Sequence, residues 1–145
     1  MKNIARITTL LIALQLISCK EDGNEKSKQD LKTDMLTEAA WSHATVTHED
    51  GDLSDQYTDF AILFTAHASD GFDGNYIISN GGYAFSETAG KWRFNDTLDK
   101  IILDSEKEMD IELEEGHLQL DFTVPAPGGK AAGLSGHFIF ELQPM

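Results

Sequence analysis

The chain has 145 residues, of which 25 are acidic and 11 are lysine or arginine, so its formal net charge is −14. A charge of this sign repels nucleic acid and anionic membrane surfaces, and we therefore exclude nucleic acid as a partner. The length corresponds to one small domain. Cys19 is the single cysteine, which excludes a disulfide bond within the chain.

The first eighteen residues have the organisation of a secretory signal peptide. Lys2 and Arg6 precede an apolar run from Leu10 to Ile17, and the small residue Ser18 follows. A cationic start, a short apolar segment and small residues at the cleavage site are the parts of such a signal. The apolar run is shorter than the roughly 20 residues that span a bilayer. We predict that residues 1–18 are a removable signal peptide.

The residues at the end of this signal resemble known lipoprotein sequences. Leu16–Cys19, LISC, resembles the bacterial lipobox, which implies that the Cys19 sulfur carries lipid and that Cys19 begins the mature protein. Two or three acyl chains such as palmitate would anchor it firmly, because each buried CH₂ contributes about 0.8 kcal/mol. Lys20, Glu21 and Asp22 resemble the export signal of Bacteroidota-type lipoproteins. This implies lipid anchoring at the outer membrane, on the cell surface, with a periplasm-facing anchor as the alternative.

Residues 19–33 are predicted to be a flexible, charged tether. Four basic and four acidic residues lie between Lys20 and Lys32, with few apolar residues to bury. The domain is expected to cover residues 34–145, where five basic residues face 21 acidic ones, a net charge of −16. A short helical turn of at most two turns is predicted at the start of this domain, with Thr33 or Asp34 as its N-cap.

After this turn the hydrophobic period is two, which is typical of strands. In residues 117–124, HLQLDFTV, apolar and polar residues alternate without interruption. Turn-forming residues separate eight such segments, and LSDQY at 53–57 predicts a further short turn. We predict an all-β fold, an eight-stranded antiparallel up-and-down barrel or a strongly curved sheet. The predicted strands are Trp41–His48, Asp59–Thr65, Asn75–Ser79, Gly90–Phe94, Lys100–Asp104, Glu108–Leu113, His117–Val124 and His137–Leu142.

Several of these segments resemble the lipocalin-like domains of small Bacteroidota-type lipoproteins. The matching stretches are LTEAAWS at 36–42, DGNY at 73–76, GKWRF at 90–94 and GGKAAGLSGHFIFEL at 128–142. The resemblance implies a lipocalin-like barrel and carries no catalytic motif. Lipocalins have Gly-x-Trp on the first strand, whereas this chain has Ala39, Ala40 and Trp41.

The polar residues do not form a recognisable catalytic or metal-binding pattern. His43 and His48 are five residues apart on one strand and should leave by opposite faces. His117 and His137 begin two neighbouring strands, so they should lie at opposite ends of the pair. The Asp- and Gly-rich stretch 69–75 lacks the oxygen spacing of a helix-loop-helix calcium site and predicts a turn. We therefore predict no catalytic residue, no metal site, no cofactor and no enzymatic activity.

One further modification site is indicated by sequence. Asp96, Thr97 and Leu98 resemble the short acceptor for protein O-glycosylation in exported proteins of the same bacterial group. The match covers three residues only. Glycosylation of Thr97 is therefore a hypothesis that the sequence leaves open.

Aromatic residues on the inward strand positions are the remaining candidates for function. An eight-stranded barrel is just wide enough either to fill with side chains or to hold one small ligand. One hypothesis is a non-enzymatic envelope lipoprotein that binds a small apolar ligand or a partner protein. The alternative is a structural or accessory subunit of an outer-membrane complex, with a filled barrel and no ligand. The candidate ligand-lining residues are Phe64, Tyr76, Trp92, Phe94, Phe122, Phe138 and Phe140.

Overall fold

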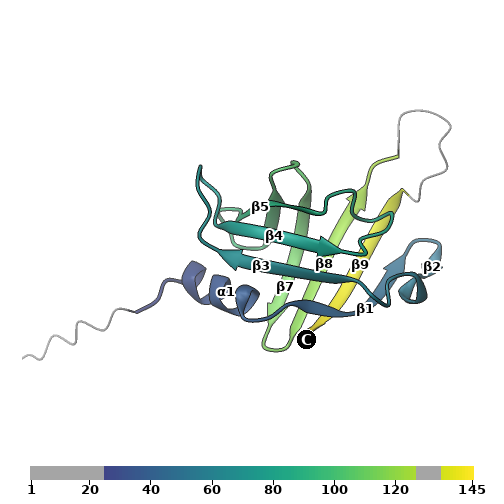
Figure 1. The fold of residues 1–145 in the computed structure, drawn as a ribbon, viewed down its shortest axis with the longest axis horizontal. Coiled ribbons are helices and arrows are strands. Elements are labelled where there is room, and N and C mark those ends of the chain that lie inside the picture. The colour runs from purple at the N-terminus through teal and green to yellow at the C-terminus, as the bar shows by residue number, and fades with distance from the viewer. Residues whose placement is uncertain (1–24, 127–134) are drawn as a thin grey trace, which may run out of the picture.

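The computed structural model describes residues 25–126 and 135–145 (Figure 1). The predicted signal peptide, the lipobox residue Cys19 and the export signal Lys20–Asp22 lie outside the described residues. The described residues form one α-helix followed by an antiparallel sheet that closes on itself. The fold class predicted from the hydrophobic period is thus confirmed.

From β3 to β9 each strand of the sheet pairs with the next one along the chain. β1 pairs with β3 and with β9, which closes an eight-stranded barrel. The two-residue strand β2 extends the sheet beside β1. Each predicted strand lies within two residues of an observed one, and the predicted short turn is the 3-10 helix η1, Ser54–Gln56. The strands are β1 (Trp41–His48), β2 (Gly51–Asp52), β3 (Ala61–Ala66), β4 (Gly74–Ser79), β5 (Ala89–Phe94), β6 (Lys100–Leu103), β7 (Glu108–Glu114), β8 (His117–Val124) and β9 (Gly136–Pro144).

The up-and-down order gives the barrel two distinct ends. At one end lie the connections 67–73, 95–99 and 115–116, together with the C-terminus and the helix α1, Lys28–Thr37. We call this the helix end. At the other end lie the connections 49–60, 80–88 and 104–107, and the end of β8, which we call the far end. Figure 1 shows α1 at the lower left and the C-terminus at the bottom, with the end of β8 and the start of β9 toward the top.

The barrel interior is packed with aromatic and aliphatic side chains. Trp92 is fully buried on β5, while Arg93 beside it is exposed, as alternation predicts. The Trp92 ring meets Phe64 and Phe94 edge to face, with ring centroids 5.8 and 5.0 Å apart. Its indole N–H donates to the Thr65 carbonyl at 3.1 Å. A second aromatic cluster lies toward the far end and contains Tyr57, Phe60, Phe85, Phe122, Phe138 and Phe140.

The helix α1 begins earlier than predicted. Its N-cap is Ser27, which accepts a hydrogen bond from the Asp30 backbone while the Asp30 carboxylate accepts one from the Ser27 backbone. This capping box satisfies two backbone N–H groups that the first turn leaves unpaired. The prediction of Thr33 or Asp34 as the N-cap is therefore wrong, as is the limit of two turns. Residues 28–33 belong to a ten-residue helix and not to a tether.

The helix is fixed to the helix end by polar contacts and by one buried side chain. Gln29 Nε2 donates to Asp73 Oδ1 at 2.9 Å, and Lys32 donates to the Leu98 carbonyl. Leu36 is fully buried, and its carbonyl accepts the indole N–H of Trp41 at 2.9 Å. The chain therefore enters the barrel at the helix end.

Candidate functional site

A groove opens at the far end because β7 and β8 separate there. The register of β7 with β8 stops at Asp110 and Asp121, whereas β8 stays paired with β9 as far as Val124 and Gly136. The groove has a volume of about 900 Å³. We call it the mouth groove. Its lining comes from the β4–β5 connection, the start of β6, the β6–β7 turn, the start of β7, the end of β8 and the start of β9. It includes Glu87, Lys100, Lys107, Asp110, Phe122 and His137.

A lysine ammonium group lies at the inner side of this groove. Lys107 Nζ donates to the Ala84 carbonyl at 2.7 Å and to Glu87 Oε2 at 3.0 Å. It also lies 4.5 Å from the ring centroid of Phe85 and 5.2 Å from that of Phe122. Only 12% of the Lys107 side chain is exposed. The ammonium group therefore covers the aromatic core at the far end.

Burial and pairing act on the two charged partners in different ways. Burial lowers the pKa of Lys107, and the hydrogen bond and charge of Glu87 oppose that shift without cancelling it. Burial acts to raise the pKa of Glu87. Hydrogen bonds from its own backbone, Ser105 and Lys107 outweigh that effect, so the Glu87 pKa lies below its usual value. The surroundings thus disfavour, on balance, the charged form of the ammonium group and favour that of the carboxylate.

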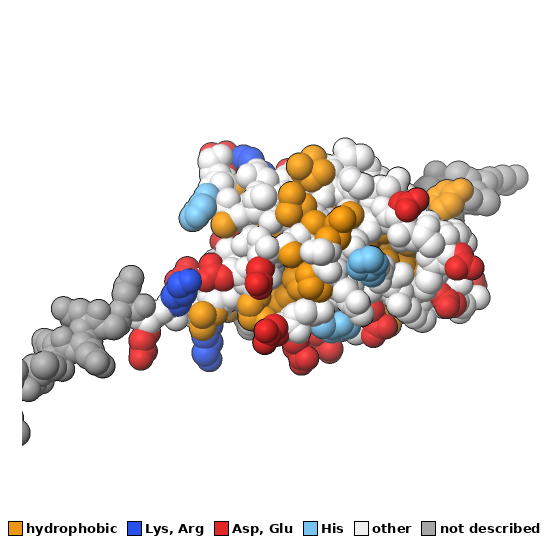
Figure 2. All heavy atoms as spheres, turned by 60° about the horizontal axis from the view of Figure 1, so that its bottom comes forward, with side chains coloured by type: hydrophobic (Ala, Val, Ile, Leu, Met, Phe, Trp, Pro, Cys, Tyr) orange, Lys and Arg blue, Asp and Glu red, His pale blue; other side chains and the backbone are white. Residues whose placement is uncertain are grey.

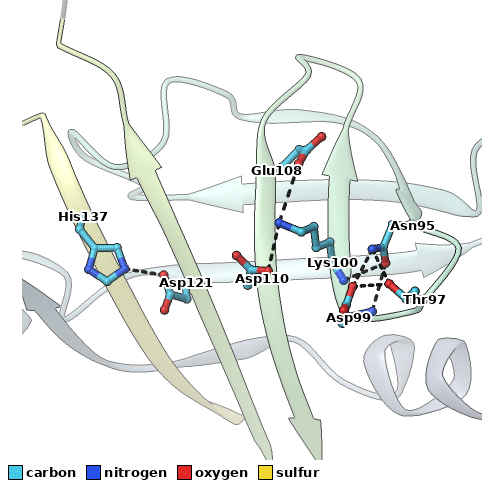
Figure 3. Close-up of polar contacts among 8 residues, drawn as sticks. All are labelled: Asn95, Thr97, Asp99, Lys100, Glu108, Asp110, Asp121 and His137. Carbon is cyan, nitrogen blue, oxygen red and sulfur yellow. Dashed lines mark hydrogen bonds and ion pairs between the residues drawn. The ribbon is translucent and has the colours of Figure 1, made fainter.

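The outer rim of the groove is a row of charged side chains on β6 to β9 (Figure 3). Lys100 Nζ lies 3.1 Å from Asp110 Oδ1, and His137 Nε2 lies 2.5 Å from Asp121 Oδ1. Asp110 and Asp121 are directly opposed across two strands, where like charges repel. The Lys100 cation offsets part of this repulsion. The hydrogen bond and charge of Asp110 in turn raise the pKa of Lys100. With Glu108 also on the rim, acidic groups predominate.

A smaller apolar groove lies at the helix end. It has a volume of about 440 Å³ between α1, the β7–β8 turn and the C-terminus. Met35, Trp41 and Met145 line it, with Glu114 and Glu115 at its border. Figure 2 brings the lower side of Figure 1 forward and shows hydrophobic side chains gathered there among acidic ones. This side of the molecule is therefore apolar at its centre and acidic at its edge.

The seven predicted ligand-lining residues are brought together in the barrel interior. Their exposed fractions lie between 0 and 6%, and all but Tyr76 pack ring against ring in two groups. Phe122, for example, stacks on Phe138 and Phe140 with centroids 6.0 and 5.7 Å apart. Phe122 also borders the mouth groove. The residues are Phe64, Tyr76, Trp92, Phe94, Phe122, Phe138 and Phe140.

The histidines lie where their spacing predicts. His43 is exposed and His48 is buried, with His48 Nε2 bonded to the Ser135 carbonyl at 3.0 Å. His117 is paired with Glu114 at one end of β8, and His137, the second residue of β9, is paired with Thr123 near the other end. Over residues 25–126 and 135–145, no group of three histidine, cysteine or acidic side chains is arranged to hold a metal ion.

The hydroxyl group of Thr97 lies in a polar turn at the helix end (Figure 3). Thr97 is exposed, donates to Asp99 Oδ1 at 2.6 Å and accepts from Asn95 Nδ2 at 2.8 Å. Its neighbours therefore use the hydroxyl to stabilise the β5–β6 turn. Glycosylation of Thr97 stays a prediction.

Sequence reasoning missed the residues at the inner side of the mouth groove. Phe85 and Glu87 lie in a connection without strand periodicity, and Lys107 lies in a turn that reads as a solvated segment. The side-chain hydrogen bonds of Lys107 join positions 20 or more residues apart. One sequence signal points to these residues of the mouth groove. Phe85 and Glu87 place an aromatic residue close to an acid within a turn-rich connection.

The fold and the mouth groove define a small, closed antiparallel barrel of lipocalin-like architecture. Comparison of the sequence with models of known protein families and with curated proteins finds no match. Within the part of the chain that the structure describes, no helix has the length and apolar character needed to cross a membrane.

Proposed function

We propose that the protein is a non-enzymatic lipoprotein of the bacterial envelope, whose filled barrel acts as an accessory module at the outer membrane. The packing of the interior carries the proposal. Each of the seven aromatic residues that an interior ligand would need to contact is at most 6% exposed. Six of them pack ring against ring in two groups, which leaves Tyr76 as the seventh. A barrel of this kind presents its outer surface and its ends to a partner protein.

The course of the chain is consistent with anchoring through Cys19. The helix α1 enters at the helix end, where Gln29 and Lys32 fix it to the barrel. A lipid on Cys19 would therefore tether the helix end, and the mouth groove at the far end would remain accessible. This arrangement suits a module that meets a partner or ligand away from its anchor.

A second candidate function is binding of a small molecule in the mouth groove. Its volume of about 900 Å³ is within the size range of small-molecule sites, roughly 300–1,000 Å³. The groove also combines an aromatic surface at Phe122 with a few convergent charged groups. Under this proposal a ligand would bind at the barrel mouth and not in the interior.

The lipid anchor is tested by Cys19→Ala. We expect the variant to take up no acyl analogue during metabolic labelling and to leave the membrane fraction, because the acylated sulfur is lost. Wild type processed in parallel is the control. Continued labelling of Cys19→Ala would refute the lipobox assignment.

Surface display is tested by replacing Lys20, Glu21 and Asp22 together with alanine. We expect lipidation to persist while the protein becomes protected from protease added to whole cells. Alanine at Glu25 and Lys26 is the matched control, because it also removes charges after the cysteine but leaves the three-residue signal intact. Equal digestion of the triple variant and the wild type would contradict surface export by this signal.

A further inference from the structure

The surroundings of the Lys107 ammonium group form a complete binding site for an amine. The Ala84 carbonyl and the Glu87 carboxylate accept two of its N–H bonds, at 2.7 and 3.0 Å. The rings of Phe85 and Phe122 lie at 4.5 and 5.2 Å, within the distance at which an aromatic ring attracts a cation. We call these four groups the ammonium seat. Ser105 donates to the other Glu87 oxygen at 2.8 Å and so orients the carboxylate.

The ammonium seat has the chemistry of a primary amine site and not of a general cation site. A primary ammonium group has three N–H donors, two of which the seat accepts. A quaternary ammonium group has none, so the Ala84 carbonyl and the Glu87 carboxylate would lose their hydrogen bonds. Buried acceptors that lose their partners discriminate strongly between otherwise similar ligands.

The seat opens into a groove whose charge attracts cations. Glu106, Glu108, Asp110 and Asp121 line the groove, against Lys100 as the further lysine. The ends of β7 and β8 separate at this point, so the seat is reached from solvent without moving a strand. Acidic lining in a cleft raises the local concentration of a cationic ligand.

We propose that the mouth groove binds a small ligand with a primary alkylammonium group, which takes the ammonium seat when the Lys107 side chain swings out into solvent. The proposal specifies the ligand class of the second candidate function and rests on it, but it does not depend on the lipid anchor. Lys107 lies at the end of the β6–β7 turn, on a flexible four-carbon stem. The exchange therefore needs a side-chain rotation and no change in the sheet.

The exchange is balanced in charge and in hydrogen bonds. One ammonium group replaces another, so the carboxylate, the carbonyl and the two rings keep a partner. Lys107 returns to water, where the desolvation that lowers its pKa is removed. The tethered side chain competes at an effective concentration on the order of millimolar, so wild-type affinity should be modest. Removing the tethered amine should raise it.

The test compares n-butylammonium with tetramethylammonium by titration calorimetry at pH 7 and constant ionic strength. Wild-type protein should bind n-butylammonium with a dissociation constant on the order of millimolar, and tetramethylammonium without saturation. Lys107→Ala should bind n-butylammonium about tenfold more tightly, because the competing side chain is gone. Equal affinity of the wild type for the two cations would overturn the proposal.

A matched pair of variants assigns the binding to the seat. Both variants are made in the Lys107→Ala background, because in the wild type the loss of the Glu87 charge would weaken the competing Lys107 amine and the ligand alike. In that background Glu87→Gln should weaken n-butylammonium binding about tenfold, because a charge-assisted hydrogen bond is lost. Glu112→Gln removes the same charge from an exposed position of β7 outside the groove and should leave the affinity unchanged. Equal affinities for these two variants would contradict the assignment. If Lys107→Ala does not fold, the discrimination of the wild type between n-butylammonium and tetramethylammonium decides the matter, and acyl labelling through Cys19 tests the anchor separately.

Discussion

The two ends of the barrel are closed by different means. At the helix end, the fully buried Leu36 and the nearly buried Trp41 cover the core, and α1 holds them in place. At the far end, the ammonium group of Lys107 lies over the rings of Phe85 and Phe122 beside an open groove. An apolar closure of the first kind serves stability alone. A charged closure of the second kind leaves a site that another amine can occupy.

The difference has an energetic basis. Burying a leucine side chain contributes roughly 1.5–3 kcal/mol, so the helix end gains stability with each apolar group that it covers. Burying an ammonium group costs desolvation energy, and its pairing with Glu87 must first offset that cost. The far end is therefore the less stable closure. Variants of the wall and of the two ends test this comparison.

The largest loss of stability is expected from a substitution in the barrel interior, between the two ends. Trp92→Ala should lower the free energy of unfolding by about 3–5 kcal/mol, because it empties a fully buried site between Phe64 and Phe94. Denaturant unfolding of the purified protein measures it. Arg93→Ala, one position along β5 and exposed, is the control and should change little. Similar small losses in both variants would mean that the interior is not tightly packed.

A slightly smaller effect is expected at the helix end. Leu36→Ala should cost about 2–5 kcal/mol of unfolding free energy, since the side chain has no exposed surface. Leu31→Ala on the same helix removes the same atoms from a side chain that is 51% exposed, and should cost far less. Equal costs in the two variants would show that α1 does not close the barrel.

The N-terminus of α1 gives a still smaller effect. Ser27→Ala should cost about 1 kcal/mol of unfolding free energy, because the capping box with Asp30 is lost. Denaturant unfolding again provides the measurement. Thr33→Ala is the informative control, because Thr33 lies inside the helix and caps nothing. A greater loss of unfolding free energy from Thr33→Ala than from Ser27→Ala would support Thr33, one of the two positions predicted from sequence, as the N-cap.

The smallest effect at neutral pH concerns a tyrosine that reaches toward the far end. Burial, followed by the negative charges of Asp104 and Glu87, raises the pKa of Tyr76, and its hydroxyl donates to Asp104 Oδ1 at 3.4 Å. Above about pH 10 the unfolded chain therefore loses a tyrosine proton that the folded chain keeps, so stability falls as pH rises.

Tyr76→Phe should reduce this alkaline loss of stability, as measured by unfolding at several pH values between about 8 and 11. The variant removes the titrating group and little else. Tyr83→Phe, at a position that is 62% exposed, should leave the pH dependence unchanged. The same alkaline slope in Tyr76→Phe and wild type would mean that another group causes the loss.

The sequence predicted the barrel wall well and the two ends poorly. Alternation is a local signal, and it located the strands and the inward direction of Trp92. The helix start was missed because Ser27 and Asp30 lie in a charged stretch whose composition suggests a tether, although their spacing is that of a capping box. The burial of Lys107 was missed because it depends on Phe85, Glu87 and Phe122, which only the closed barrel brings together.

The central claim is that the interior is filled and that ligand chemistry belongs to the mouth groove. It is tested most directly by titrating the purified wild-type protein with a neutral apolar naphthyl probe while recording tryptophan emission. Trp92 lies among the interior rings, so a bound probe would quench it. We predict no saturable quenching, and no displacement of n-butylammonium by the probe. Saturable one-to-one quenching of tryptophan emission in the wild type, absent in Trp92→Ala, would show an interior ligand site and contradict the account.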